Sequence, residues 1–116
     1  MAEDAIIRTM LFDYYGDFLT EKQKEYYDLH YNEDLSLFEI SEETGVSRQA
    51  VWDNIKRAEA SLNNAESKLG LVDKQLRREE KKAEISERLK GLRDFLPDDK
   101  KPELDYVLKM LRESIE

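Results

Sequence analysis

The sequence predicts an all-α protein of five or six helices, organised around a helix-turn-helix between Ser36 and Leu62. Three observations carry this prediction. Apolar residues recur every three or four positions, the spacing of a helix face. A capping box, in which Ser or Thr is followed three residues later by Gln or Glu, occurs at Thr20 and again at Ser36. Gly45 then separates two helical segments by a short turn, because Gly tolerates the left-handed conformation of a helix exit.

Residues 36–58 have the residue order of a helix-turn-helix. Leu37 and Ile40 share one face of a first short helix, Val46 fills the turn, and Ser47 caps the second helix. The buried stripe of that second helix is predicted to be Val51, Ile55 and Ala58. An ordinary helical hairpin of a bundle has a similar pattern. The spacing favours the helix-turn-helix, although Thr44 stands where a more apolar residue is usual.

Polar residues on the outer side of the second helix are the candidate nucleic-acid contacts. They are Ser47, Arg48, Gln49, Asp53, Lys56 and Arg57. Arg and Gln can each make paired hydrogen bonds to base edges, so Arg48 and Gln49 suit sequence reading. Lys56 and Arg57 suit phosphate oxygens, which position the protein without specifying a sequence.

The charge balance weakens the nucleic-acid interpretation. The chain of 116 residues has a net charge of −8, from 19 basic and 27 acidic residues. Residues 1–35 carry −6, residues 36–69 carry −2, and residues 70–116 are neutral. The predicted recognition helix, residues 47–57, is locally +2. Since phosphate contacts supply much of nucleic-acid affinity, tight duplex binding by a monomer is not expected.

Composition argues against catalysis and against several kinds of site. The chain has no Cys and only His30, which excludes thiolate metal sites and most imidazole chemistry. No nucleophile–base set or phosphate loop is present, so we expect no enzyme activity, no metal and no cofactor. No apolar run approaches the roughly 20 residues of a membrane span, and residues 1–10 lack the pattern of an export signal. A cytoplasmic protein is expected.

The first 35 residues are predicted to form two further helices. Residues 2–15 place Ile6, Met10 and Tyr14 on one stripe, widened by Ile7 and Leu11, which we expect to close the core of the helix-turn-helix. The second helix begins at Thr20 and carries a cluster of aromatic residues: Tyr26, Tyr27, His30 and Tyr31. The cluster suits a ligand site or a core with polar tips at its edge, and the core is the simpler interpretation.

The second half of the chain is predicted to be a helical extension. Lys68 and Gly70 indicate that the helix from Ser47 ends there, with a new helix near Asp73. Cations between Arg77 and Lys82 alternate with glutamates, which is typical of a solvated helix and less so of a phosphate patch. Pro97 ends this helix. A last helix has an apolar stripe: Leu104, Val107, Leu108, Leu111 and Ile115.

We therefore expect two domains, residues 1–66 and 67–116, with the second packed on the first or on a second subunit. A homodimer is expected, because the second half has more leucine than a lone hairpin can cover. The candidate interface residues are Trp52, Leu62, Leu69 and Leu76. Three interpretations of Trp52 remain open: packing on the N-terminal helix, stacking on an unpaired base, or a subunit interface.

Residues 19–62, with LTEKQ and LSLFEISEETGVSRQAV, resemble the promoter-contacting fourth region of bacterial sigma factors. SRQAVWDNIKR at 47–57 and KLGL at 68–71 resemble more closely the YlxM family of small bacterial helix-turn-helix proteins, over essentially the whole chain. That resemblance implies a sigma region 4-like or winged-helix-like module and a part in the signal recognition particle pathway. Such a part makes a structured RNA a candidate target beside promoter DNA.

Two functions follow. The first is a nucleic-acid-binding regulatory protein whose target is DNA or structured RNA. The second is a non-catalytic adaptor that uses the helix-turn-helix scaffold to bind a protein such as a signal recognition particle component, which the net charge and Trp52 favour.

Overall fold

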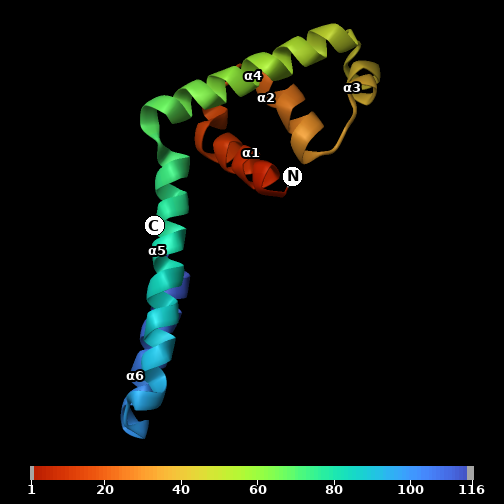
Figure 1. Ribbon diagram of the computed structural model, residues 1–116. Helices are drawn as coiled ribbons and strands as arrows, with labels where there is room; N and C mark the ends of the chain where they lie inside the picture. The colour runs from red at the N-terminus through yellow and green to blue at the C-terminus, as the bar shows by residue number, and fades with distance from the viewer. Residues whose placement is uncertain (1, 115–116) are drawn as a thin grey trace. The chain divides into compact units, whose positions relative to one another are not determined.

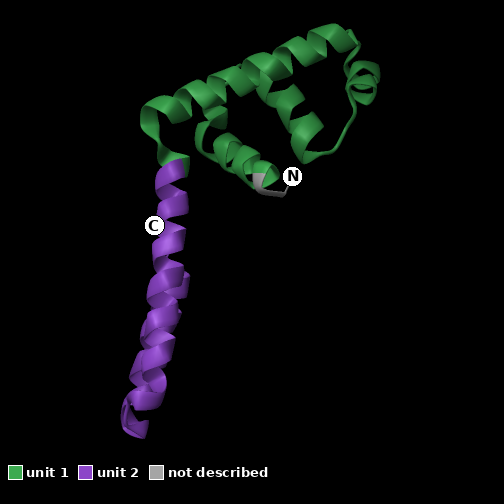
Figure 2. Ribbon diagram, in the orientation of Figure 1, with its two compact units in different colours: residues 1–72 green, residues 73–116 purple. Residues whose placement is uncertain are grey.

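The computed structural model describes residues 2–114 and has two compact units, residues 1–72 and 73–116 (Figures 1 and 2). Six α-helices make up most of this part of the chain, which confirms the all-α prediction. They are α1 (Ala2–Tyr15), α2 (Glu21–Tyr27), α3 (Leu37–Thr44), α4 (Arg48–Leu69), α5 (Leu71–Leu92) and α6 (Lys101–Glu113). No strand occurs between residues 2 and 114, so this helix-turn-helix has no β-wing there.

The helix boundaries in the first unit follow the predicted capping signals. The side chains of Thr20 and Ser36 each accept a hydrogen bond from the backbone N–H three residues on. In turn, the side chains of Gln23 and Glu39 accept the backbone N–H of Thr20 and Ser36. Gly45 ends α3 in the left-handed conformation, with φ of 74°. These local hydrogen bonds satisfy helix-end N–H groups that have no partner within the helix.

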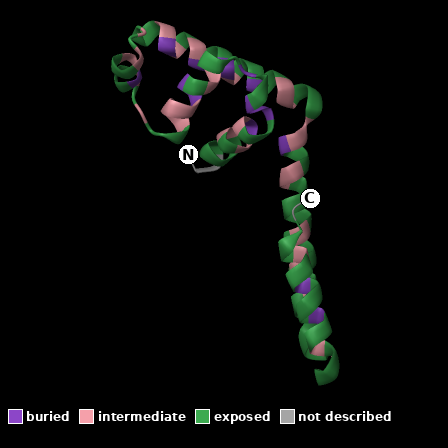
Figure 3. Ribbon diagram, turned by 180° about the vertical axis from the view of Figure 1, so that it is seen from behind, coloured by how far each residue is buried: buried purple, intermediate pink, exposed green. Residues whose placement is uncertain are grey.

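The core of the first unit lies along α4, which packs against α1, α2 and α3 (Figures 1 and 3). The predicted stripe of Val51, Ile55 and Ala58 is fully buried, and Leu62 continues it one turn further. Tyr26 and Ile40 complete a cluster with Val51 and Ile55. Burial of this stripe is the main contribution to the stability of the unit.

The predicted stripe of α1 is only partly correct. Leu11 is buried and Met10 is half-buried, but Ile6 and Tyr14 are 57% and 39% exposed, and Tyr15, which is not part of the predicted stripe, is buried. The Tyr15 hydroxyl donates a hydrogen bond to Glu66 Oε1 at 2.6 Å and accepts one from the Leu71 N–H at 3.0 Å. A buried hydroxyl needs such partners, and this rotation of α1 provides them.

The aromatic cluster at the end of α2 and in the turn that follows it is part of the core, as the simpler interpretation predicted. Tyr26 and Tyr27 are buried, and Phe12 of α1 stacks on Tyr27 with ring centres 5.4 Å apart. Tyr31, in the π-helical turn η2 (Asp28–Asn32), directs its hydroxyl to Glu59 at 2.5 Å. His30, in the same turn, lies with Nδ1 2.8 Å from the Leu35 carbonyl oxygen.

The helix from Ser47 ends at Gly70, as predicted, with Gly70 in the left-handed conformation at φ of 64°. Its successor α5 begins at once, at Leu71, two residues before the predicted start. Glu66 Oε1 accepts the Val72 N–H at 3.0 Å, and Val72 is buried. This start of α5 belongs to the first unit, which ends at Val72. The sequence-based expectation places the domain boundary earlier, between residues 66 and 67.

The second unit is an antiparallel hairpin of α5 and α6. Lys82 Nζ donates to the Ser114 carbonyl oxygen at 2.5 Å near one end, and Arg93 pairs with Asp105 near the other. The charged run of α5 forms ion pairs along its own helix, including Arg77–Asp73 and Arg88–Glu84, as expected of a solvated face. Of the predicted α6 stripe, Leu104 and Leu108 are buried, Leu111 is half-buried, Val107 is exposed, and Ile115 lies outside the described residues.

None of the helices in residues 2–114 is both long enough and apolar enough to cross a membrane.

Candidate nucleic-acid interface

The turn between α3 and α4 fixes the direction in which α4 leaves the helix-turn-helix. Thr44 Oγ1 donates to the Ile40 carbonyl oxygen at 2.7 Å and accepts the Val46 N–H at 3.3 Å. Thr44 therefore takes part in the turn through its hydroxyl, although an apolar residue is usual at this position. Val46 packs against the core cluster from inside the turn. The start of α4 is thereby held in one orientation relative to α3.

Ser47 has a structural task at this start. Its Oγ accepts the Ala50 N–H at 3.1 Å, so it caps α4. Arg48 is exposed, and its guanidinium lies 5.8 Å from the ring centre of Phe38 in α3. Phe38 is itself 55% exposed, so this cation and this ring form a joint surface feature.

Gln49 and Asp53 lie one turn apart on the outer face of α4 and bond to each other. Gln49 Nε2 donates to Asp53 Oδ1 at 2.9 Å. A base edge that takes up the paired hydrogen bonds of Gln49 has to replace this contact.

Lys56 is held between an aromatic ring and a carboxylate. Its Nζ lies 4.7 Å from the ring centre of Trp52 and 3.4 Å from Glu59 Oε2. Arg57, on the same exposed face, forms no ion pair with any residue that the structure describes. Lys56 is thus partly neutralised, and Arg57 is the more available cation.

Trp52 packs against the core cluster next to η2. It is half-buried, and its ring meets the edge of the His30 ring with centres 6.4 Å apart. Part of the indole stays accessible beside Lys56, so this packing leaves the stacking and interface interpretations of Trp52 open.

The other candidate interface residues fall in different surroundings. Leu62 is 1% exposed and continues the buried stripe of α4, so its side chain is not available to a second chain and that prediction is wrong. Leu69 is exposed near the end of α4, and Leu76 is half-buried in α5.

The electrostatics of the candidate surface are local. Residues 1–72 contain seven basic and fifteen acidic residues, a net of −8, and the whole net charge of the chain lies there. Four of the seven cations are exposed on α4, three of them in its first half (Arg48, Lys56 and Arg57) and Lys68 near its end. The preceding helix α3 exposes Glu39, Glu42 and Glu43. Only a small basic surface is present, bordered by carboxylates, and it can neutralise few phosphates.

Sequence reasoning singled out Trp52 but missed Phe38, the aromatic side chain that accompanies Arg48. Phe38 follows Ser36 on the solvent side of α3, and its proximity to Arg48 depends on the angle between two helices. A large apolar residue off the buried stripe of α3 was the available signal. The structure shows no group of three or more acidic or His side chains within residues 2–114 that could hold a metal ion.

Comparison with known proteins identifies the family. Residues 2–101 match UPF0122, described as "Putative helix-turn-helix protein, YlxM / p13 like". A UPF0122 protein of Thermoanaerobacter sp. is 39% identical over 116 residues, which cover 100% of this chain and 97% of that protein. One from Halalkalibacterium halodurans is 50% identical over 90 residues, 78% of this chain and 79% of the relative. One from Desulforamulus reducens is 58% identical over 65 residues, 56% of each chain. The chain belongs to the UPF0122 family of YlxM/p13-like helix-turn-helix proteins.

Proposed function

We propose that this protein is a non-catalytic, cytoplasmic regulator that binds nucleic acid through α4 of its helix-turn-helix. One observation carries the proposal: in a unit of net charge −8, three of seven cations are exposed between residues 48 and 57, in the first half of the helix that follows the turn. In helix-turn-helix proteins this is the helix that enters the nucleic-acid groove.

In this proposal the side chains of α4 divide their roles. Arg48 and Gln49, at the start of the helix, read base edges, and Gln49 exchanges its bond to Asp53 for the base. Arg57 and Lys56 bind phosphates. Ser47 contributes its backbone and the helix end, since its hydroxyl already caps α4.

The aromatic partners favour a structured RNA over duplex DNA as the target. Phe38 is exposed next to Arg48, and Trp52 is accessible next to Lys56. Unpaired bases stack on such rings, whereas the bases of a duplex are already stacked on each other. A small basic surface with two rings suits a loop or bulge better than a long duplex. We infer from the family resemblance that the regulated process is the signal recognition particle pathway.

The experiment that tests the proposal measures binding of RNA and DNA as a function of salt. Nucleic acids that copurify with the full-length protein at low salt are sequenced, and fluorescently labelled copies are titrated. Because bound phosphates release counterions, log K should fall linearly with log salt. With two or three phosphate contacts the slope should be about −2, which is shallow for a nucleic-acid-binding protein.

The double variant Arg48→Ala, Lys56→Ala should abolish this binding and keep the helical content of the chain. The matched control is Arg77→Ala, Arg88→Ala, which also removes two exposed positive charges, here from α5. Unchanged binding by the α4 variant would show that α4 is not the contact helix. Equal loss in both variants would show an unspecific charge effect.

A second function, a protein-binding adaptor, is favoured by the exposed side of α1. Ile6, Ile7 and Tyr14 are exposed there, on a unit with fifteen carboxylates, which suits a basic protein partner with an apolar stripe. The resemblance suggests a signal recognition particle component as that partner. Salt distinguishes the two functions, because an apolar contact persists at salt concentrations that release nucleic acid.

A further inference from the structure

The hairpin of α5 and α6 buries little of its own apolar surface. Only Leu104 and Leu108 are buried in residues 73–114. Units of about 40 residues rarely fold alone without a disulfide, a metal or oligomerisation. The chain has no Cys, and no metal-binding group occurs in the described residues.

Four of the six large exposed apolar side chains of the hairpin lie on one side of its seam, and the other two, Phe95 and Tyr106, do not. Successive residues of a helix turn by about 100°, so Val107 lies to one side of Leu104 and Asp105 to the other. Likewise, Leu92 at the end of α5 lies to one side of the half-buried Leu89, and Arg93, the next residue, lies to the other side of Leu89. In an antiparallel pair the same sense of rotation in both helices leads to the same side of the hairpin.

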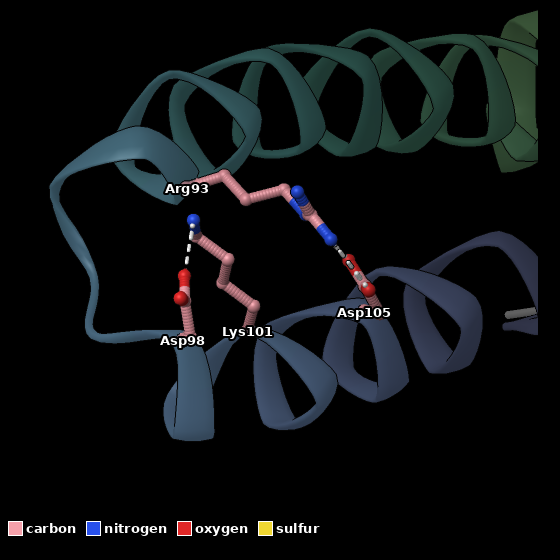
Figure 4. Close-up of polar contacts among 4 residues, drawn as sticks. All are labelled: Arg93, Asp98, Lys101 and Asp105. Carbon is pink, nitrogen blue, oxygen red and sulfur yellow. Dashed lines mark hydrogen bonds and ion pairs between the residues drawn. The ribbon is translucent and has the colours of Figure 1, made fainter.

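The ion pair between the helices identifies the two sides. Arg93 Nε and Nη2 donate to the two carboxylate oxygens of Asp105 at 3.0 and 3.1 Å, as Figure 4 shows, and Lys101 pairs with Asp98 in the same view. Arg93 and Asp105 therefore mark the charged side. The opposite side is the hairpin apolar face, formed by Ile85 (40% exposed), Leu92 (54%), Val107 (39%) and Met110 (53%).

We propose that the hairpin apolar face binds the same face of a second copy of this chain, so that two hairpins form an antiparallel four-helix bundle. This goes beyond the nucleic-acid proposal and does not depend on it. On α5, residues 85, 89 and 92 are spaced by steps of four and three, the heptad spacing of helices that pack in bundles. Two apolar layers placed face to face complete a core that one layer lacks.

Charge also favours a second copy as the occupant. Residues 73–116 contain twelve basic and twelve acidic residues, so two hairpins meet without net repulsion. By helical position, Lys81 and Arg88 border the face along α5, and Glu103 borders it along α6. A two-fold axis that places α5 of one copy against α6 of the other sets a basic border against an acidic one.

The test is the oligomeric state of the full-length chain by sedimentation velocity across a concentration series, without nucleic acid. We expect a dimer for the parent protein. Leu92→Glu and Val107→Glu should each weaken self-association roughly tenfold or more, because each buries a carboxylate in an apolar contact. Ala83→Glu is the matched control: it adds the same charge to α5, away from the face, and should leave the dimer intact. A monomeric parent protein, or unchanged dimerisation of both face variants, would overturn the proposal.

Single cysteines test the same face if a Glu variant loses helix content. Because the chain has no Cys, Ile85→Cys, Leu92→Cys, Val107→Cys and Met110→Cys each give one reactive thiol. At least one of them should cross-link efficiently to its copy with a short bis-maleimide, and Ala83→Cys should not. If no face position cross-links better than Ala83→Cys, the face is not the interface. Dimerisation of the Arg48→Ala, Lys56→Ala variant should match the parent protein whether or not α4 binds nucleic acid.

Discussion

The two units of this protein differ in how they use their apolar residues. In residues 1–72 the long helix α4 packs against α1, α2 and α3, and eleven hydrophobic residues are buried. In residues 73–114 two helices bury two hydrophobic residues and expose six large ones. The first unit also carries the whole net charge of −8, while the second is neutral. The comparison indicates that the first unit folds on its own core and that the second depends on a further surface.

The largest expected difference between the units is in the cost of removing a core side chain. Ile55→Ala should cost about 2–5 kcal/mol of unfolding free energy, towards the upper end, since Ile55 is fully enclosed. Leu108→Ala should cost about 2 kcal/mol of unfolding free energy, because the cavity would be open to solvent on one side and the neighbouring side chains can move to fill it. Trp52 is the only tryptophan, so its fluorescence reports the first unit while circular dichroism reports both. Equal losses would contradict the difference between the two cores.

Alkaline pH should destabilise the first unit selectively. Burial raises the pKa of Tyr27 and of Tyr31 to about 12, and burial together with the Glu66 carboxylate raises the pKa of Tyr15. All three lie in the first unit. Their contribution to stability is complete below pH 10, the pKa of an unfolded tyrosine, and is lost as the pH rises from 10 through 12.

The measurement is the urea midpoint of Trp52 fluorescence at pH 9 and at pH 11. The midpoint should be clearly lower at pH 11, and Tyr31→Phe should reduce the change. A midpoint independent of pH in this range would mean that the tyrosines ionise as easily in the folded unit as in the unfolded chain.

Two glycines should respond in opposite directions. Gly45→Ala should destabilise the first unit by about 1–2 kcal/mol, because a Cβ disfavours its left-handed conformation. Gly91 lies near the end of α5, with no atom within 4 Å of where a Cβ would be added. Gly91→Ala should therefore stabilise the second unit by about 0.5–1 kcal/mol. Thermal unfolding followed by circular dichroism measures both, and a loss of stability in Gly91→Ala would contradict the open environment of this residue.

The smallest expected effect is that of the ion pair across the hairpin. A hydrogen bond from Arg93 lowers the pKa of Asp105 below 3.8, the value of an unfolded Asp. The stability that the pair contributes is therefore complete above about pH 3.8 and is lost as the pH falls through the lower pKa of the folded state. Asp105→Asn should lower the stability of the second unit only slightly, because both side chains are exposed. A nuclear magnetic resonance titration of the Asp105 carboxyl checks the direction of the shift. A pKa at or above the usual range would exclude the pair in solution.

The sequence by itself determined the features that depend on a few neighbouring residues. Thr20 with Gln23, and Ser36 with Glu39, are local hydrogen-bonding pairs, and Gly45 and Gly70 end helices for a reason contained in one residue. The same reasoning identified the exposed polar residues at the start of α4, because an apolar stripe also defines the opposite side of its helix.

The tertiary structure decided which side of α1 is buried. Ile6, Met10 and Tyr14 form the centre of one apolar stripe, Leu11 lies at its edge, and Tyr15 lies beyond that edge. Periodicity alone does not show that the side with Leu11 and Tyr15 is the buried one. The choice depends on Glu66 and the Leu71 N–H, which are 51 and 56 residues from Tyr15. The contact of Arg48 with Phe38 and that of Trp52 with His30 were unpredictable for the same reason. Local signals specify where a helix begins and ends, but only a distant hydrogen-bond partner or packed ring specifies which way it turns.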